Sequence, residues 1–224
     1  MTARTKLKDR ILPTYTRGEE IFNMVTHIVG GGFGVIALVA CVMISALAGN
    51  TVGIVCSAIF GASMIVLYTA SSLYHGLRHD GAKRVFQVLD HCTIYFLIAG
   101  TYTPMLLCSL IKVAPRAAML TLVAVWALAI LATTLTAIDI KKYKVFSMIC
   151  YIGIGWAIIF SIRSMYAALS PVGFWLLLSG GIAYTLGAVL FKVGKHVKYF
   201  HSIFHLFVLA GSVLHTLCIV FYVL

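Results

Sequence analysis

The chain has 224 residues, of which 62% are hydrophobic and only 10% are charged, and its mean hydropathy is +1.04. This composition excludes a water-soluble globular domain, and the length allows several membrane spans of about 20 residues each. The formal net charge of +11 could indicate nucleic-acid binding. The basic residues lie in the breaks between apolar runs, however, which is the pattern of membrane topology, so we exclude nucleic acid as a partner.

The apolar runs predict an all-α membrane protein, a seven-transmembrane helix bundle, because a helix satisfies its own backbone hydrogen bonds in lipid. Residues 1–20 are polar and basic, without the apolar core of a secretory signal peptide, and are expected to form a cytoplasmic N-terminal segment. Residues 21–224 are expected to form the seven-helix transmembrane domain. The expected spans are 21–48, 52–77, 85–111, 117–138, 145–162, 167–191 and 199–224.

Lysine and arginine residues predict the orientation of the bundle, because they concentrate in cytoplasmic loops. Of the 17 basic residues, 14 fall in the N-terminal segment and in the loops after the second, fourth and sixth spans. The other three, Lys112, Arg116 and Arg163, fall on the opposite side. The N-terminus is therefore predicted to be cytoplasmic and the C-terminus external, in a multi-pass protein of the inner (plasma) membrane of the cell.

Five polar side chains are predicted to share one depth at the cytoplasmic end of the bundle. Ser71 and His75 are four residues apart at the end of the second span, and Asp90 lies near the start of the third. His201 and His205 are also four residues apart, so both project from one face of the seventh span. Ionisable groups inside a span are costly and usually functional, so this convergence indicates a site.

The residue types at that depth indicate zinc. Three imidazoles, His75, His201 and His205, leave a fourth zinc position for water, whose pKa zinc lowers to about 7. Asp90 is the predicted catalytic acid–base residue, and Ser71 is expected to hold the water, orient an imidazole or donate to a developing oxyanion. Each histidine taken alone could instead cap a helix or bond a carbonyl, and only their shared depth favours a metal.

Glu20, Asn23 and His27 form a second polar stripe at the cytoplasmic end of the first span. Two interpretations stay open for it: a set of partners for the metal ligands or for a polar substrate group, and a helix-entry network without chemistry. His91 is expected to point away from the face of Asp90. His215 is expected to make a hydrogen bond between helices.

The positions of glycine, proline and cysteine residues predict local packing. The glycines at positions 30, 31, 32 and 34 lie inside the first span and favour close helix packing over phosphate binding. Pro104 is expected to kink the third span. The six cysteines lie in apolar runs at irregular spacing, which predicts packing residues and no disulfide framework.

These residues carry a resemblance to the progestin and adipoQ receptor family. It rests on Glu20-x-x-Asn23-x-x-x-His27, Ser71-x-x-x-His75, Asp90-His91 and His201-x-x-x-His205. The stretches LDHCTIYFLIAGTYTP and HSIFHLFVLAGSVLH resemble its bacterial branch, the hemolysin III proteins. The resemblance implies seven helices with a cytoplasmic N-terminus and zinc held by His75, His201 and His205. Members of the wider superfamily, the adiponectin receptors and alkaline ceramidases, are linked to ceramide hydrolysis, and the bacterial branch to membrane homeostasis.

Three functions compete at this point. The first is an intramembrane zinc-dependent hydrolase of lipid amide or ester bonds, with membrane lipids and zinc as partners. The second is a non-enzymatic protein that senses or regulates membrane state and carries structural zinc. The third is a cytolytic, hemolysin-like protein, which the residues favour least because no polar stripe runs the full depth of several spans.

Overall fold

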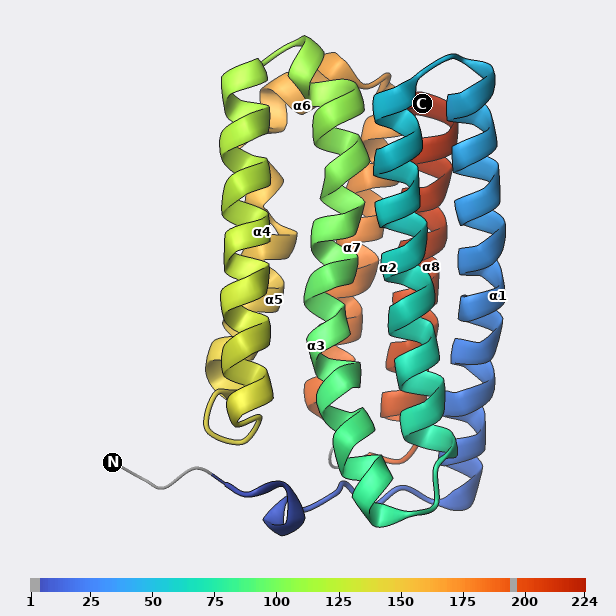
Figure 1. The fold of residues 1–224 in the computed structure, drawn as a ribbon, viewed down its shortest axis with the longest axis vertical. Helices are drawn as coiled ribbons and strands as arrows, with labels where there is room; N and C mark the ends of the chain where they lie inside the picture. The colour runs from blue at the N-terminus through green and yellow to red at the C-terminus, as the bar shows by residue number, and fades with distance from the viewer. Residues whose placement is uncertain (1–4, 194–196) are drawn as a thin grey trace.

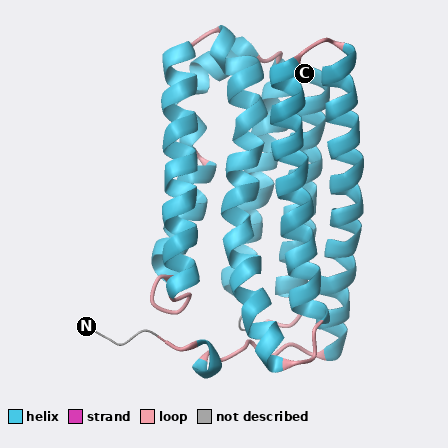
Figure 2. Ribbon diagram, in the orientation of Figure 1, coloured by secondary structure: helices cyan, strands magenta, loops and turns pink. Residues whose placement is uncertain are grey.

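The structure, a computed structural model, describes residues 5–193 and 197–224, and within these ranges it contains helices and no strands (Figure 1 and Figure 2). Seven helical stretches of the described chain are long and apolar enough to cross a membrane, which confirms the predicted seven-helix fold. The helices are α1 (Arg17–Leu47), α2 (Thr51–Gly76), α3 (Asp80–Pro104), α4 (Pro115–Ile138), α5 (Lys144–Gly155), α6 (Ile162–Ala168), α7 (Pro171–Val193) and α8 (Phe200–Tyr222). Short 3-10 and π segments are η1 (Leu7–Asp9), η2 (Met105–Ser109), η3 (Leu110–Lys112) and η4 (Ala157–Ser161).

Capping residues shift two helix starts from their expected places. α1 begins four residues early because Thr16 and Glu19 form a capping box, in which each side chain bonds the backbone N–H of the other residue. α3 begins five residues early because the side chain of His79 accepts a hydrogen bond from the backbone N–H of Ala82. Residues 17–20, expected in the N-terminal segment, therefore belong to the first transmembrane helix.

Two spans are less regular than the apolar runs predict. The fifth crossing continues past the expected end at residue 162, through η4 and α6, so that Arg163 lies in a helix instead of a loop. In the third crossing the α-helix ends at Pro104 and continues as the π segment η2, because proline has no N–H to donate to the preceding turn. The expected disturbance at Pro104 is thus a change of helix type.

The helices pack as neighbours along the chain, with one closure between its two ends. α1 packs on α2, α2 on α3, α3 on α4 and α7 on α8, and α8 also contacts α1. The N-terminal segment and the α2–α3 and α4–α5 loops lie at the lower end of Figure 1, and the C-terminus lies at the upper end. The predicted basic loops share that lower end, except that Arg4 and Lys195 lie outside the described residues.

Glycines let α1 approach α2 closely. A Cβ atom on Gly30 would lie 2.6 Å from the Tyr68 ring, and one on Gly34 would lie 3.2 Å from Ile65. On the α2 side, a Cβ atom on Gly61 would lie 2.5 Å from the Cβ and 2.7 Å from the Cα of Leu38. The predicted close packing is confirmed at Gly30 and Gly34, and Gly61 extends it.

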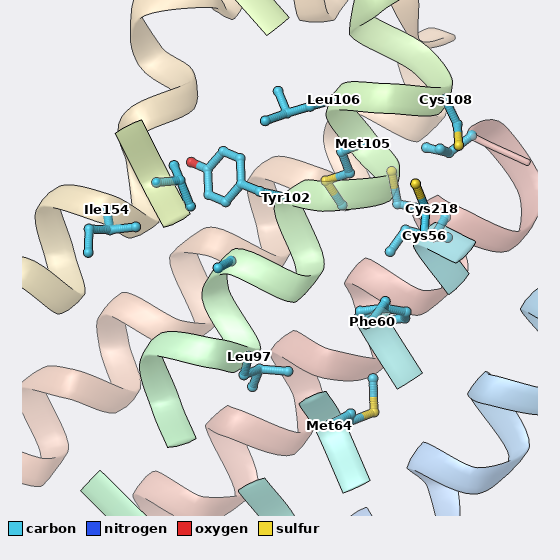
Figure 3. Packing of buried hydrophobic residues seen from close by; sticks show 14 of the residues in the cluster. Cys56, Phe60, Met64, Leu97, Tyr102, Met105, Leu106, Cys108, Ile154 and Cys218 are labelled. Carbon is cyan, nitrogen blue, oxygen red and sulfur yellow. The ribbon is translucent and has the colours of Figure 1, made fainter. Parts of the chain in front are cut away.

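The apolar core takes buried residues from most of the helices, and Figure 3 shows the part of it around α2, α3 and the π segment η2. Phe60 and Met64 of α2 and Leu97 of α3 are fully or almost fully buried there. Cys56, Cys108 and Cys218 gather in the upper part of this view as packing residues, and all six cysteines are free thiols. The predicted absence of a disulfide framework is confirmed.

Replacing Gly61 with alanine is expected to destabilise the bundle by about 1–3 kcal/mol, the usual cost of overpacking, because the new methyl group meets the backbone of Leu38. Gly32→Ala is the matched control. It adds the same methyl group to the neighbouring helix, at a position with nothing within 4 Å. Unfolding of both variants by a denaturing detergent, followed by circular dichroism, measures the difference, and equal midpoints would contradict the packing role of Gly61.

Candidate metal centre

Three buried histidines converge at the lower end of the bundle. His75 comes from the last turn of α2, and His201 and His205 come from one face of the first two turns of α8. The Nε2 atom of His201 lies 3.4 Å from that of His75 and 3.1 Å from that of His205. One ligand atom of each histidine lies within 4.8 Å of the others, so the three rings can hold a metal ion.

The spacing of these nitrogens fits zinc. Two nitrogens that each bind zinc at about 2.05 Å with tetrahedral angles lie about 3.3 Å apart, close to the 3.1 and 3.4 Å found here. Imidazole nitrogen is also a preferred zinc donor. Three protein ligands leave one tetrahedral position for water or substrate. The imidazole donors and two of their three N···N spacings therefore fit the zinc ion that the sequence predicts.

Glu20 of α1 fixes the orientation of the His75 ring. The His75 Nδ1–H donates to the Glu20 carboxylate at 2.6 Å, and Lys83 of α3 donates to the other carboxylate oxygen at 2.6 Å. A proton held on Nδ1 leaves the lone pair of Nε2 directed at the cluster, the usual arrangement behind a metal-binding histidine. Asn23 of α1 also contacts His75, because its amide nitrogen lies 3.5 Å from His75 Nδ1.

His27 completes the α1 stripe by stacking on a candidate metal ligand. Its ring lies 3.8 Å from the His205 ring at an interplanar angle of 19°, and meets the Tyr68 ring edge-on. Both ring nitrogens of His27 are buried without a hydrogen-bond partner. Glu20, Asn23 and His27 thus all contact the histidine cluster, which favours the interpretation of the stripe as partners of the ligands.

The start of α8 is fixed to the start of α1. The buried Glu19 carboxylate accepts hydrogen bonds from the Thr16 hydroxyl and backbone N–H and, at 2.8 Å, from the backbone N–H of Tyr199. Tyr199 has a φ of 63°, a left-handed conformation that is uncommon for a residue with a side chain. This turn starts α8 one residue later and so sets the position of His201 against α1.

The described part of the N-terminal segment, residues 5–16, crosses the lower end of the bundle as a strap (Figure 1). At its start, the backbone N–H of Thr5 donates to the Asp139 carboxylate at 2.8 Å. Burial alone would raise the pKa of the Asp139 carboxyl, but hydrogen bonds from the N–H groups of Thr5, Lys142 and Lys141 lower it to about 2. The carboxylate is thus ionised and anchors the strap at neutral pH.

At its other end, the strap places Tyr15 against the cluster. The Tyr15 ring stacks on His201 with centroids 4.9 Å apart and lies 5.7 Å from the His75 ring. Burial, together with the negative charges of Asp90, Glu20 and Glu19, raises the pKa of the Tyr15 phenol well above its usual value. Tyr15 is therefore a neutral ring that covers the metal site from the strap side.

A largely apolar cavity of about 180 Å³ leads away from the cluster between α3, α5, α7 and α8. Its lining includes His201 and His205 at the metal end, together with Ser71 and Asp90. The Ser71 hydroxyl is buried without a hydrogen-bond partner. Both predicted catalytic residues thus line the same cavity as two of the histidines.

His91 does not point away from Asp90, and that expectation is wrong. Its Nδ1 atom lies 3.7 Å from the Asp90 carboxylate, donates to the Gln87 carbonyl at 2.8 Å, and the ring lines the same cavity. Adjacent helical residues are only about 100° apart around the axis, so a wide cavity can touch both. His215 behaves as predicted, because its Nε2–H bonds the Leu177 carbonyl of α7 at 3.0 Å.

The sequence did not reveal the roles of Tyr15, Glu19 and Lys83. Lys83 was counted as an ordinary loop cation, yet it is buried against Glu20. Tyr15 belongs to the short uncharged stretch 11–16 in an otherwise basic segment, and this contrast was the available signal for a docked strap. Nothing in the spacing of Glu19 indicated that it would bond the start of α8.

Comparison with known proteins identifies the family of the chain. A family model described as "Haemolysin-III related" matches residues 15–216. The chain is 39% identical over 206 residues to Hemolysin-3 of Bacillus cereus, covering 92% of each chain. It is 38% identical over 208 residues to the Hemolysin-3 homolog of Bacillus subtilis strain 168, covering 93% of this chain and 96% of that one.

A more distant similarity reaches animal proteins. The chain is 28% identical over 162 residues to the human Monocyte to macrophage differentiation factor, covering 70% of this chain and 66% of that one. The family match includes every histidine of the cluster as well as Tyr15, Glu20 and Asp90. With its seven spanning helices, this multi-pass membrane protein therefore belongs to the haemolysin III-related family.

Proposed function

We propose that the chain is a zinc-dependent intramembrane hydrolase of lipid amide or ester bonds that contributes to membrane homeostasis. The observation that carries this proposal is the three-histidine cluster at the polar end of a largely apolar cavity, which is also lined by Asp90 and Ser71. An apolar cavity inside a bundle suits a lipid acyl chain, while the cluster suits the polar group at which that chain begins. The resemblance to a superfamily that includes alkaline ceramidases adds support.

The residues around the cluster have distinct roles in this proposal. His75, His201 and His205 would hold the zinc ion, which when bound would supply Lewis acidity and lower the pKa of a water molecule towards neutral. Asp90 takes a proton from the attacking water and returns it to the leaving nitrogen or oxygen. The water oxygen ends on the acyl carbon as a carboxylic acid, and the broken bond releases an amine or an alcohol. The unpartnered hydroxyl of Ser71 donates to the oxyanion that develops on the acyl group.

A structural metal without catalysis is the second candidate. It is favoured by the deep burial of all three histidines, each less than a tenth exposed, and by the ring of His27 stacked on His205. The fourth ligand separates the two candidates, since water indicates catalysis and a protein side chain indicates structure. We favour catalysis because an acid and a hydroxyl share the cavity with the cluster.

Zinc content is the first test of the site. We expect about one zinc per purified chain, and His201→Ala or His205→Ala is expected to remove most of it, because two imidazoles hold the ion weakly. Glu20→Gln keeps the shape of the side chain but removes the charge that orients His75, and is expected to weaken zinc binding by about 10–100-fold. Elemental analysis and competition with a chelator give both quantities.

The matched control is His79→Asn. His79 is exposed, lies just beyond α2, and caps α3 with its side chain, a role that asparagine fills well. This variant is expected to retain full zinc. Full retention of zinc in the His201 and His205 variants would remove the proposed site.

We propose that the N-terminus is cytoplasmic and the C-terminus external, in the inner membrane, because of the distribution of basic residues. Reporter fusions test this orientation: a reporter active only in the cytoplasm is expected to work at the N-terminus and to fail at the C-terminus. The reverse pattern would place the metal cluster at the external face of the membrane.

Hydrolysis is the test of the proposed chemistry. Asp90→Asn is expected to keep zinc and lower the rate by about a hundredfold, the scale of lost acid–base help. Ser71→Ala is expected to cost less, because zinc itself also stabilises an oxyanion. The assay measures fatty acid released from short-chain ceramides and phospholipid esters in nanodiscs.

Ser72→Ala is the control for Ser71→Ala, because the neighbouring hydroxyl is satisfied by the Tyr68 carbonyl at 2.7 Å and lies outside the cavity lining. It is expected to behave as wild type. Wild-type rates in Asp90→Asn would contradict its role as the base. Failure of zinc-loaded wild type to cleave any of these lipids would favour the structural metal.

A further inference from the structure

A second hollow lies on the strap side of the metal cluster. It is a groove of about 990 Å³ between the strap, the start of α1, the end of α2 and the start of α3. We call it the basic groove. Its charged lining residues are Lys8, Asp9, Arg10, Arg17, Glu20, Arg78, Asp80, Lys83 and Arg84.

The metal cluster lies between the basic groove and the apolar cavity. His75 lines the groove, whereas His201 and His205 line the cavity. Tyr15 and Glu20 also line the groove, and both contact the cluster. The two hollows share no lining residue. A lipid whose reacting bond lies at the cluster would therefore place its acyl chain in the cavity and its headgroup in the groove once the Tyr15 ring is displaced from His201.

Half of the basic side chains in the groove already have partners. Lys83 is paired with Glu20 at 2.6 Å, and Arg84 lies 3.7 Å from Asp80 and donates to a backbone carbonyl of the strap at 3.0 Å. The guanidinium of Arg10 is buried and donates to the carbonyl of Ile138 at the end of α4. These three side chains build the groove through those contacts, although Nε and Nη1 of Arg10 are buried without a hydrogen-bond partner.

The other half are free. Lys8, Arg17 and Arg78 are exposed, and none of them makes a side-chain hydrogen bond or ion pair with the described residues. Asp9 is the one groove carboxylate in the described chain that is likewise without a partner. Three free cations against one free anion leave the groove positive. The cations come from three different segments: the strap, α1 and the α2–α3 loop.

Phosphate is the anion that this arrangement fits. Arginine binds phosphate oxygens through two parallel N–H donors, and lysine binds them as a point charge. Basic residues next to the ends of membrane helices attract anionic lipid headgroups. Membrane topology alone accounts for positive charge at this end of the bundle, but it does not require that three free cations share a groove with a metal-ligand histidine.

We infer that the basic groove binds the phosphate of a lipid headgroup while the acyl chain of the same lipid occupies the apolar cavity. One part of this inference rests on the proposed function, namely that the bound lipid is also the substrate that is hydrolysed. The substrate class is then an anionic phospholipid, cleaved by water at the bond between its acyl chain and the remainder of the lipid. Neutral ceramide, which has no phosphate, becomes the poorer ligand.

The experiment measures binding separately from turnover. Purified protein in uncharged detergent, zinc-loaded and zinc-stripped, is titrated with phosphatidic acid, with diacylglycerol or ceramide of the same acyl chains, and with inorganic phosphate. Wild type is expected to bind phosphatidic acid at least about tenfold more tightly than either neutral lipid, because each cation near the headgroup adds to the attraction. Binding is expected to survive removal of zinc, since the cations hold the phosphate.

Two triple variants separate the groove from general surface charge. Lys8→Gln with Arg17→Gln and Arg78→Gln is expected to abolish the preference for phosphatidic acid. Lys141→Gln with Lys144→Gln and Lys192→Gln removes the same charge from exposed positions at the same end of the bundle, outside the groove, and is expected to keep the preference. Zinc content and size-exclusion profile check that both variants fold.

Three results would overturn the inference. They are equal affinity for phosphatidic acid and diacylglycerol, equal loss in both triple variants, and competition by inorganic phosphate as strong as that by the lipid, which would indicate a site for free phosphate. Cleavage of ceramide but not of phospholipids would leave the hydrolase proposal standing and reject the anionic substrate. Phosphatidic acid binding without any hydrolysis would support the groove and reject the hydrolase.

Discussion

Burying three imidazoles side by side inside an apolar bundle is the constraint on which the rest of the structure depends. Buried polar nitrogens are costly unless each has a partner. Although Nδ1 of His205 has no hydrogen-bond partner among the described residues, α1 supplies the hydrogen-bond partner of His75 and a ring contact for His205. It lies against both α2 and α8, and contributes Glu20 behind His75 and His27 on His205. The glycines that let α1 approach α2 therefore help to hold Glu20 and His27 against the histidine cluster.

The same constraint explains why the site could be found in the sequence. Ligands at helix ends lie within a few residues of the basic loops, so their depth can be counted along the chain without knowing any contact. Counting residues from the basic loops predicted that five side chains lie at one end of the bundle: Ser71, His75, Asp90, His201 and His205. In the structure the three histidines form one cluster, and Ser71 and Asp90 line one cavity. Depth is a one-dimensional quantity, and the sequence encodes it directly.

Two kinds of feature could not be predicted in this way: those that depend on how a helix is rotated about its own axis, and those in segments without an apolar period. The side of α3 that faces the cavity depends on how its neighbours pack, so His91 was misplaced. The strap has no apolar period, and its anchors at Asp139 and Arg84 are distant in sequence from the residues that they bind. The interruption of the fifth crossing at η4 and α6 could not be recognised either, because the sequence around η4 is a continuous apolar run.

The division of ligands between α2 and α8 has a consequence for how the protein is made. His75 enters the membrane early in synthesis, but the other two histidines arrive only with the last helix. During that interval Glu20 already has its partners, His75 and Lys83, among residues made before α4. The nascent chain thus holds one of the three candidate ligands together with its partner. A metal ion could be held by all three histidines only after α8, the seventh spanning helix, inserts beside α1.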